Sequence, residues 1–272
     1  MACSECKMSN SVLLDIDQRG VATVTLNRPQ KHNAFDDVII AELTDTFTRV
    51  AANRDAKVMV LCATGKSFSA GGDLQWMKRM ADFSYSENVE DAKKLAEMLE
   101  TLNTLSVPTI ARVQGAAYGG AVGLVSCCDM AVANENATFC LSEVKVGIAP
   151  ATISPYVIAA IGSRAARRYF LTAEPFSSNT ARSLGLISEV AQADELDSYL
   201  NKLIEALLAN SPQAIKVSKQ LIANVEHHDM DEVLMEYTSE TIARLRVSQE
   251  GQEGLSAFFE KRAPSWQNKT DE

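Results

Sequence analysis

The chain has 272 residues, of which 46% are hydrophobic, and it carries a formal net charge of −9 at neutral pH. This length supplies ample material for one large domain or two small ones. The acidic balance argues against a nucleic-acid partner, and no apolar run has the length of a membrane span. The N-terminus has neither the apolar core of a signal peptide nor the pattern of a transit peptide, so we expect a cytoplasmic protein with no membrane partner.

The pattern of apolar residues predicts strands that alternate with helices. Two alternating runs at 11–17 and 21–26 predict a β-hairpin, and the next helix is expected to begin at Asn33 or Asp36. The further elements follow in chain order: a buried strand at 57–62, a glycine-rich turn at 67–73, a helix over 89–102, a strand at 109–113, a glycine-rich turn at 115–123 that opens a helix, strands at 130–133 and 138–141, helices at 154–169 and 179–183, a last strand at 185–191, and helices at 196–209, from 212, at 231–247 and at 252–261. This alternation predicts an α/β fold, and its strand pair followed by a helix indicates a coiled stack rather than a simple βαβ sheet.

The cysteines predict no metal site. Cys3 and Cys6 form a C-x-x-C pair in residues 1–10, which we expect to be a loose N-terminus. A zinc site needs a second ligand pair, and neither the other cysteines nor the histidines have suitable spacing. The other cysteines lie in apolar runs and are expected to be buried: Cys62, Cys127, Cys128 and Cys140.

Two glycine pairs precede predicted helices. Gly71-Gly72 comes before Asp73 and one helix, and Gly119-Gly120 opens another. The N–H groups at a helix start have no intrahelical partner and favour negative charge. Two such amides can hold one carbonyl oxygen, and Glu143, at a predicted strand end, can move protons beside it. This combination suits the enolate that forms when charge enters a thioester carbonyl.

Two simpler interpretations compete with this hypothesis. The glycine pairs could form tight strand–helix junctions that bind nothing. Glu143 could cap a nearby helix or pair with Lys145. The sequence contains no G-x-S-x-G, Walker A or H-E-x-x-H motif.

Six motifs resemble those of one enzyme family. They are Asn27–Phe35 (NRPQKHNAF), Phe68–Leu74 (FSAGGDL), Gly115–Gly120 (GAAYGG), Cys128-Asp129, Ser142–Gly147 (SEVKVG) and Phe258–Arg262 (FFEKR). In this order they resemble the enoyl-CoA hydratase/isomerase, or crotonase, family. The resemblance implies a ββα spiral core over 11–195 that contains the active site. It also implies a helical C-terminal trimerisation region over 196–272, assembly into homotrimers or hexamers, and acyl-CoA substrates. Coenzyme A is then part of the substrate, and no separate cofactor is expected.

The resemblance also implies roles for individual residues. The oxyanion-hole amides fall on Gly72 and Gly120, and the catalytic carboxylate falls on Glu143. The remaining implied contacts are with coenzyme A, from the same subunit or a neighbouring one: Lys31, Ser69, Ala70, Asp73, Leu74, Phe259 and Lys261.

One position departs from the best-known hydratase pattern. Those enzymes use two glutamates, and the first corresponds to Gly123 in this chain, so Glu143 must act alone or with water or an unidentified acid. Isomerases of the family also keep only the later glutamate. The segments around the glycine turns and Glu143 resemble most closely bacterial 3-methylglutaconyl-CoA hydratases of leucine breakdown, whose relatives act on carboxygeranoyl-CoA. We therefore expect a hydratase of 3-methylglutaconyl-CoA. The alternatives are a carboxygeranoyl-CoA-type hydratase, a Δ3-Δ2-enoyl-CoA isomerase, and a non-enzymatic acyl-CoA- or RNA-binding protein on the same fold.

Several polar and aromatic residues near these motifs are expected to be structural or solvated. Asp73 is expected to cap a helix, in addition to its implied place near coenzyme A. Trp76 and Met77 could equally line the acyl pocket or pack the helix. A packing or solvated role is favoured for the others: Tyr118, Asp129, Tyr156, Lys78, Arg79 and Lys145.

Overall fold

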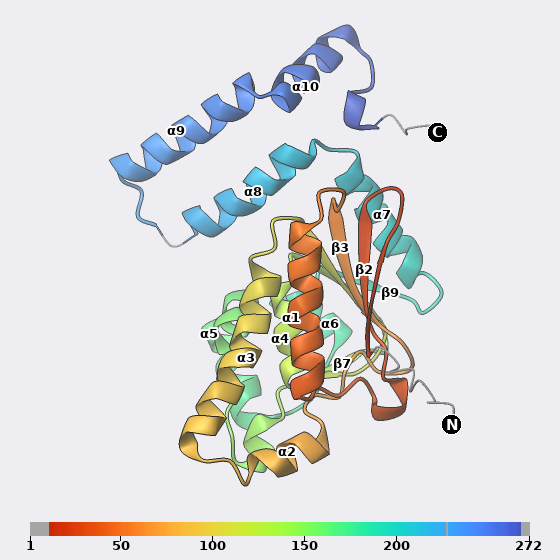
Figure 1. Ribbon diagram of the computed structural model, residues 1–272, viewed down its shortest axis with the longest axis vertical. Coiled ribbons are helices and arrows are strands. Elements are labelled where there is room, and N and C mark those ends of the chain that lie inside the picture. The colour runs from red at the N-terminus through yellow and green to blue at the C-terminus, as the bar shows by residue number, and fades with distance from the viewer. Residues whose placement is uncertain (1–10, 227, 268–272) are drawn as a thin grey trace, which may run out of the picture.

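The computed structural model describes residues 11–226 and 228–267; the predicted loose N-terminus, with Cys3 and Cys6, lies outside them. Its centre is a six-stranded sheet in the order β1-β2-β3-β4-β6-β9 (Figure 1). The first two strands form the predicted antiparallel hairpin, and every later neighbour is parallel. The strand bounds are β1 Val12–Ile16, β2 Val21–Leu26, β3 Val58–Ala63, β4 Thr109–Val113, β6 Met130–Asn134 and β9 Glu189–Ala191.

A second, smaller sheet lies beside the first. Its strands are β5 Ala117–Tyr118, β7 Thr138–Cys140 and β8 Phe176–Ser177. Two isolated parallel bridges connect further segments to this layer: one pairs Ser69 with Ala117, and the other pairs Phe35 with Gly72. The chain therefore returns repeatedly from the large sheet to this short-stranded layer, which is the spiral that the sequence predicted.

Helices cover the sheet, and their capping residues explain where they begin. Asp36 caps α1 (Asp37–Ala52) by accepting a hydrogen bond from the Ile39 N–H at 3.0 Å. Helix α3 (Tyr85–Asn103) begins earlier than its apolar pattern predicts, because Ser84 and Glu87 form a capping box. The shorter helices in this part of the chain are α2 (Leu74–Met80), α4 (Gly120–Cys127), α5 (Ser154–Thr172) and α6 (Ser178–Leu184).

The last predicted strand is shorter than its sequence indicates. Residues from Gly185 onward read as strand, but Gly185 adopts a left-handed conformation that ends α6. Leu186 donates a backbone hydrogen bond to Ala181 at 3.0 Å, so pairing with β6 begins only at Glu189.

The two faces of the large sheet have separate hydrophobic cores. The larger core lies between the sheet and helices α1, α3, α4 and α5. On the other face, Leu196, Leu200 and Ile204 of α7 (Leu196–Leu208) pack on valines of β2, β3 and β6. By packing, α7 therefore belongs with the sheet, although the sequence pattern groups it with the C-terminal helices.

Helices α8, α9 and α10 form an arm that projects from the core (Figure 1). Their bounds are Pro212–Val225, Glu232–Val247 and Gln249–Glu260. Lys219 of α8 ties the arm to the core, because its Nζ lies 2.8 Å from Asp129 Oδ2. Asp129 also accepts a hydrogen bond from the Thr109 N–H at 2.7 Å, which agrees with its predicted structural role. Within the described ranges, no helix is long and apolar enough to cross a membrane.

Candidate active site

The first glycine turn presents its amide to solvent. Phe35 donates to the Gly71 carbonyl at 2.8 Å and accepts from the Asp73 N–H at 2.6 Å. Gly72 lies between Gly71 and Asp73, and in a parallel bridge its own N–H and C=O therefore point away from Phe35. The Gly72 amide donates no hydrogen bond within the described part of the chain, and Gly72 is exposed.

The second turn provides a similar amide at the start of a helix. Gly119 donates to the Cys140 carbonyl at 2.8 Å and reverses the chain with φ 56° and ψ −125°. Helix α4 then begins at Gly120, whose N–H belongs to the first turn and needs a partner from outside the helix. Among residues 11–226 and 228–267, the Gly120 N–H donates no hydrogen bond.

The two turns lie directly against each other. A Cβ on Gly71 would lie 3.1 Å from the Tyr118 carbonyl oxygen, and a Cβ on Gly119 would lie 3.9 Å from Gly71 Cα. Both glycines have positive φ, so a side chain at either would cost backbone strain as well as space. The structure therefore brings together the two predicted amide turns, which are about fifty positions apart in the sequence.

The side chain of Glu143 lies against the second glycine turn. This residue follows β7 and begins a short 3-10 helix, η2 (Glu143–Val146). A Cβ on Gly119 would lie 3.3 Å from Glu143 Oε1. Its other oxygen, Oε2, is buried and has no hydrogen-bond partner among the described residues. Burial raises the pKa of this carboxyl above its ordinary value of 4.5, against a smaller opposing effect of a backbone hydrogen bond.

The simpler interpretations of Glu143 do not match this geometry. Within the described ranges, Glu143 caps no helix through its side chain and forms no ion pair with Lys145. A buried carboxylate oxygen without a partner destabilises the folded state, so its presence calls for a functional reason. The arrangement is suited to moving a proton beside an anion held by the two amides.

Position 123 is closed to a side chain. Gly123 lies one turn beyond Gly120 in α4, and a Cβ there would lie 2.4 Å from Ile153 Cγ2 and 3.5 Å from Leu99 Cδ2. Ile153 is 2% exposed. Position 123 is the one at which the two-glutamate hydratases carry their first glutamate. The structure adds that the Ile153 side chain occupies the space beside it. Sequence reasoning missed Ile153 because it reads as one more apolar residue.

Apolar side chains form walls around the amides. A Cβ on Gly72 would lie 3.4 Å from Met77 Cγ and 3.7 Å from a ring carbon of Trp76, and a Cβ on Gly120 would lie 3.4 Å from the Phe35 ring. Trp76 and Met77 thus pack directly on the first glycine turn. Phe35 ends the NRPQKHNAF motif, and nothing in that pattern predicts that its ring lies beside Gly120.

Asp73 and Lys31 form an ion pair beside the first turn. Asp73 Oδ1 accepts a hydrogen bond from the Gln75 N–H at 2.8 Å and caps α2, as predicted. Its Oδ2 lies 2.9 Å from Lys31 Nζ, and this hydrogen bond lowers the pKa of the Asp73 carboxyl. Arg28 lies 3.7 Å from the same oxygen. Lys31 remains partly exposed, so it can offer charge to an anionic ligand near Gly72.

The other predicted contacts with coenzyme A have different environments. Ser69 is fully buried, and its Oγ accepts a hydrogen bond from the Gly71 N–H at 3.2 Å, so its side chain supports the turn instead of facing solvent. Ala70 and Leu74 are exposed beside Gly72. Phe259 and Lys261 lie at the end of α10, at the opposite end of the molecule from α2 (Figure 1). A single chain therefore does not bring them to the glycine turns.

Two of the residues expected to be structural or solvated have side-chain partners outside the site. Tyr118 Oη lies 3.1 Å from Thr138 Oγ1, and Arg79 pairs with Asp37. Lys145 is exposed. Burial raises the pKa of the Tyr156 hydroxyl.

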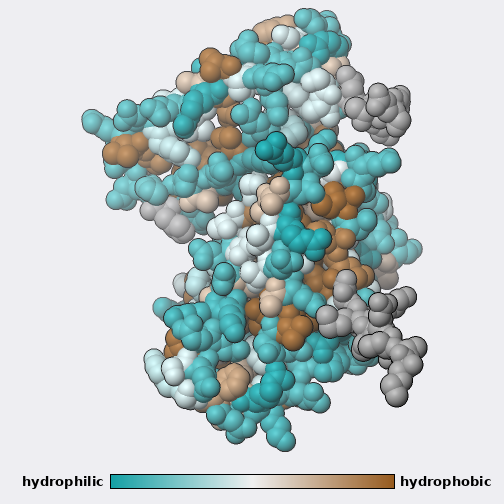
Figure 2. Space-filling model, in the orientation of Figure 1, coloured by the Kyte–Doolittle hydropathy of each residue, from teal (hydrophilic) through white to brown (hydrophobic). Residues whose placement is uncertain are grey.

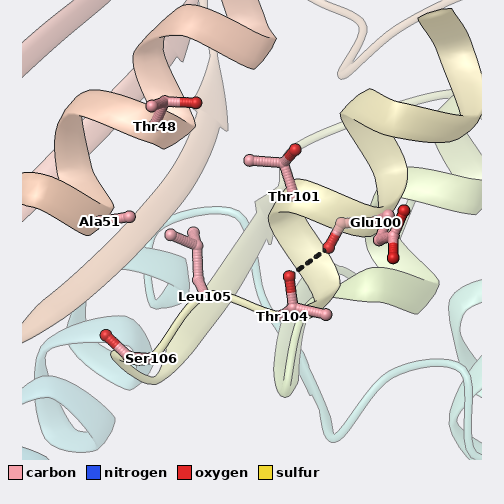
Figure 3. A pocket seen from close by; sticks show the side chains of 7 residues that line it. All are labelled: Thr48, Ala51, Glu100, Thr101, Thr104, Leu105 and Ser106. Atoms are coloured by element: carbon pink, nitrogen blue, oxygen red, sulfur yellow. Dashed lines mark hydrogen bonds between the residues drawn. The ribbon is translucent and has the colours of Figure 1, made fainter.

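A surface depression elsewhere contains none of these groups. Figure 3 shows it between the C-terminal turns of α1 and α3, where every lining side chain except Leu105 is small or polar. Thr104 donates a hydrogen bond to the Glu100 carbonyl of its own helix. The glycine turns and Glu143 therefore remain the candidate active site.

The fold is similar to those of solved enoyl-CoA hydratases. Residues 17–269 match the enoyl-CoA hydratase/isomerase family, and the chain belongs to it. A crystal structure of an enoyl-CoA hydratase from Shewanella pealeana is similar, with a TM-score of 0.91 and 48% identity over 94% of this chain and 96% of that chain. A putative enoyl-CoA hydratase of Thermus thermophilus is 29% identical over 93% of this chain and 99% of its own length. The 2,3-dehydroadipyl-CoA hydratase of Escherichia coli is 28% identical over 95% and 100%. These comparisons confirm the predicted family, the spiral fold and an enzymatic role.

Proposed function

We propose that the enzyme is a hydro-lyase that adds water across the double bond of a 2-enoyl-CoA, with 3-methylglutaconyl-CoA as its substrate. The observation that carries this proposal is the Glu143 carboxylate, whose buried Oε2 has no hydrogen-bond partner among the described residues and whose Oε1 lies against the second of the two adjoining glycine turns. The acyl-CoA thioester is the substrate class of the family.

In the proposed reaction, the Gly72 and Gly120 amides bind the thioester oxygen and stabilise the enolate. Glu143 takes a proton from water as the hydroxyl group attacks the β-carbon. The same carboxyl, now protonated, returns that proton to the α-carbon, so that one water is added in full. A raised pKa suits this double role, because the group must both accept and release a proton.

The substrate assignment rests on the resemblance and on one relative. The Escherichia coli relative is named for a dehydroadipyl thioester, whose acyl group also carries a distal carboxylate. A turnover screen of enoyl-CoAs with and without a distal carboxylate tests the assignment, and carboxygeranoyl-CoA belongs in it. Preference for short unbranched enoyl-CoAs would contradict it. In this proposal the enzyme serves leucine degradation in the cytoplasm.

An isomerase is the second candidate, because one carboxylate can also shuttle a proton between two carbons. Incubation of 2-enoyl- and 3-enoyl-CoA in ¹⁸O-labelled water separates the two reactions. Hydration incorporates the label into the product, whereas isomerisation does not. Double-bond migration without label would replace the hydratase proposal.

We also propose that the arm mediates assembly into a homotrimer or hexamer. Figure 2 shows hydrophobic side chains exposed on this arm, and Phe258 and Phe259 are each 76% exposed. In an assembly, Phe259 and Lys261 of one subunit would approach the coenzyme A bound by another. Sedimentation analysis tests this, and a monomer at micromolar concentration would contradict it.

A further inference from the structure

The segment that follows Glu143 has few anchors in the rest of the protein. Residues 144–149 and Ala151 are exposed, and Pro150 and Ile153 are its buried residues. The backbone hydrogen bonds of the segment are local, from Ile148 to Glu143 at 3.3 Å and from Ser154 to Ala151 at 3.2 Å. Local bonds hold the shape of a loop, but they do not fix its position on the core.

Ile153 is the buried side chain that ends this segment. It is 2% exposed and immediately precedes α5. Its Cβ would lie 2.9 Å from a Cβ at position 123, so its branched side chain rests directly on the backbone of α4. Gly123 is the residue that allows this approach.

The contact lies on the helix that carries one of the anion-binding amides. Positions 120 and 123 are three residues apart and share a face of α4. The N-terminal end of the segment, at Glu143, follows β7. This strand is fixed to the second glycine turn, because the Cys140 carbonyl accepts a hydrogen bond from the Gly119 N–H at 2.8 Å. Ile153 fixes the C-terminal side of the segment to the same helix.

We propose that Ile153 is a positioning residue, which fixes the segment 143–153 on α4 and thereby holds the Glu143 carboxylate at its working distance from the Gly120 amide. In this proposal Gly123 leaves the space that the Ile153 side chain fills, in addition to lacking the carboxylate of the two-glutamate hydratases. This inference rests on the proposed function of Glu143.

Substitutions of matched size test the proposal. Ile153→Val keeps both γ-carbons on Cβ, whereas Ile153→Ala removes them, including the Cγ2 that approaches Gly123 most closely. Ile161→Ala removes the same volume from a buried position two turns further along α5. Each variant is assayed over a range of enoyl-CoA concentrations up to saturation, well below its melting temperature.

We expect Ile153→Ala to lower kcat by about 10- to 100-fold with little change in KM, because a displacement of about 1 Å at a reacting group can cost about 100-fold. Ile153→Val and Ile161→Ala should keep kcat within about 3-fold, since small core changes away from the site act mainly on stability. Gly123→Ala should behave like Ile153→Ala. The double variant Gly123→Ala/Ile153→Ala should lose less than the product of the two single losses.

Hydrogen exchange followed by mass spectrometry gives a readout that needs no turnover. Ile153→Ala should speed exchange in peptides covering 143–153, and Ile161→Ala should not. Equal kcat losses in Ile153→Ala and Ile161→Ala, or unchanged exchange in Ile153→Ala, would overturn the positioning role. Absence of turnover by the wild type on every enoyl-CoA would overturn the proposed function. The hydrogen-exchange result would then still show whether Ile153 fixes the segment 143–153.

Discussion

Replacement of Glu143 by glutamine tests the catalytic proposal most directly. Glutamine keeps the shape of the side chain but cannot accept the proton of water. General acid–base catalysis contributes about 10²–10⁴ in rate, and here one group serves both proton transfers. We therefore expect kcat to fall by about 10³–10⁴, which corresponds to about 4–5.5 kcal/mol. KM should change little, because the amides and the Lys31 region are untouched.

The same substitution should change stability in a direction that depends on pH. Burial raises the pKa of Glu143 above its ordinary value of 4.5, so the folded state favours the protonated carboxyl. That stabilisation is fully present below pH 4.5 and is lost as pH rises through the raised pKa. Glu143→Gln, which resembles the protonated form, should therefore be more stable than the wild type at pH 8, with a smaller difference near pH 4.

Two assays measure these effects. Hydration is followed by loss of the enoyl-thioester absorbance, and unfolding is followed in urea at several pH values. Glu135→Gln is the control, because Glu135 is exposed and the charge change is the same. Wild-type kcat in Glu143→Gln would refute the catalytic role. A loss of stability at pH 8 would refute the account of a buried carboxylate without a partner.

Four further results are expected. The acidic limb of the kcat/KM profile should have its midpoint above 4.5, because activity requires the ionised Glu143 and burial raises its pKa; a midpoint at or below that value would contradict this. Gly119→Ala should destabilise the protein by about 1–3 kcal/mol and lower kcat, since the residue has φ 56° and its methyl group would lie 3.3 Å from the Glu143 carboxylate; urea unfolding and the hydration assay measure the two effects. Asp73→Ala should cost about 0.5–2 kcal/mol in urea unfolding, because α2 loses its cap. Lys31→Ala should raise KM with kcat nearly unchanged, and an equal loss in kcat would argue against a role in binding alone.

The sequence predicts the large sheet and its helices because long apolar patterns determine them. The hairpin of β1 and β2 and the cap of α1 at Asp36 are confirmed. The strands β5 and β8 were not predicted, because two residues are too short to show an alternating pattern. Strand β9 was predicted too long, because Gly185 was not recognised as a helix end.

The residues of the candidate site could be named from motifs, but not their environments. The meeting of the Gly71 and Gly119 turns depends on single-residue bridges between distant segments. The burial of Ser69 and of Glu143 Oε2 likewise follows from the packing of neighbouring layers. Ile153 could have been noticed only by asking what fills the space beside Gly123, and that question needs coordinates.

Both groups proposed to bind the thioester oxygen belong to the main chain. A substitution at either position keeps the backbone N–H, and only proline removes it. The anion site and the proton-transfer groups are therefore separable in design: an engineer could exchange the pair at positions 123 and 153, or move the carboxylate, without rebuilding the part that stabilises the enolate. The scaffold thus offers one fixed electrophilic centre around which different proton chemistry can be installed.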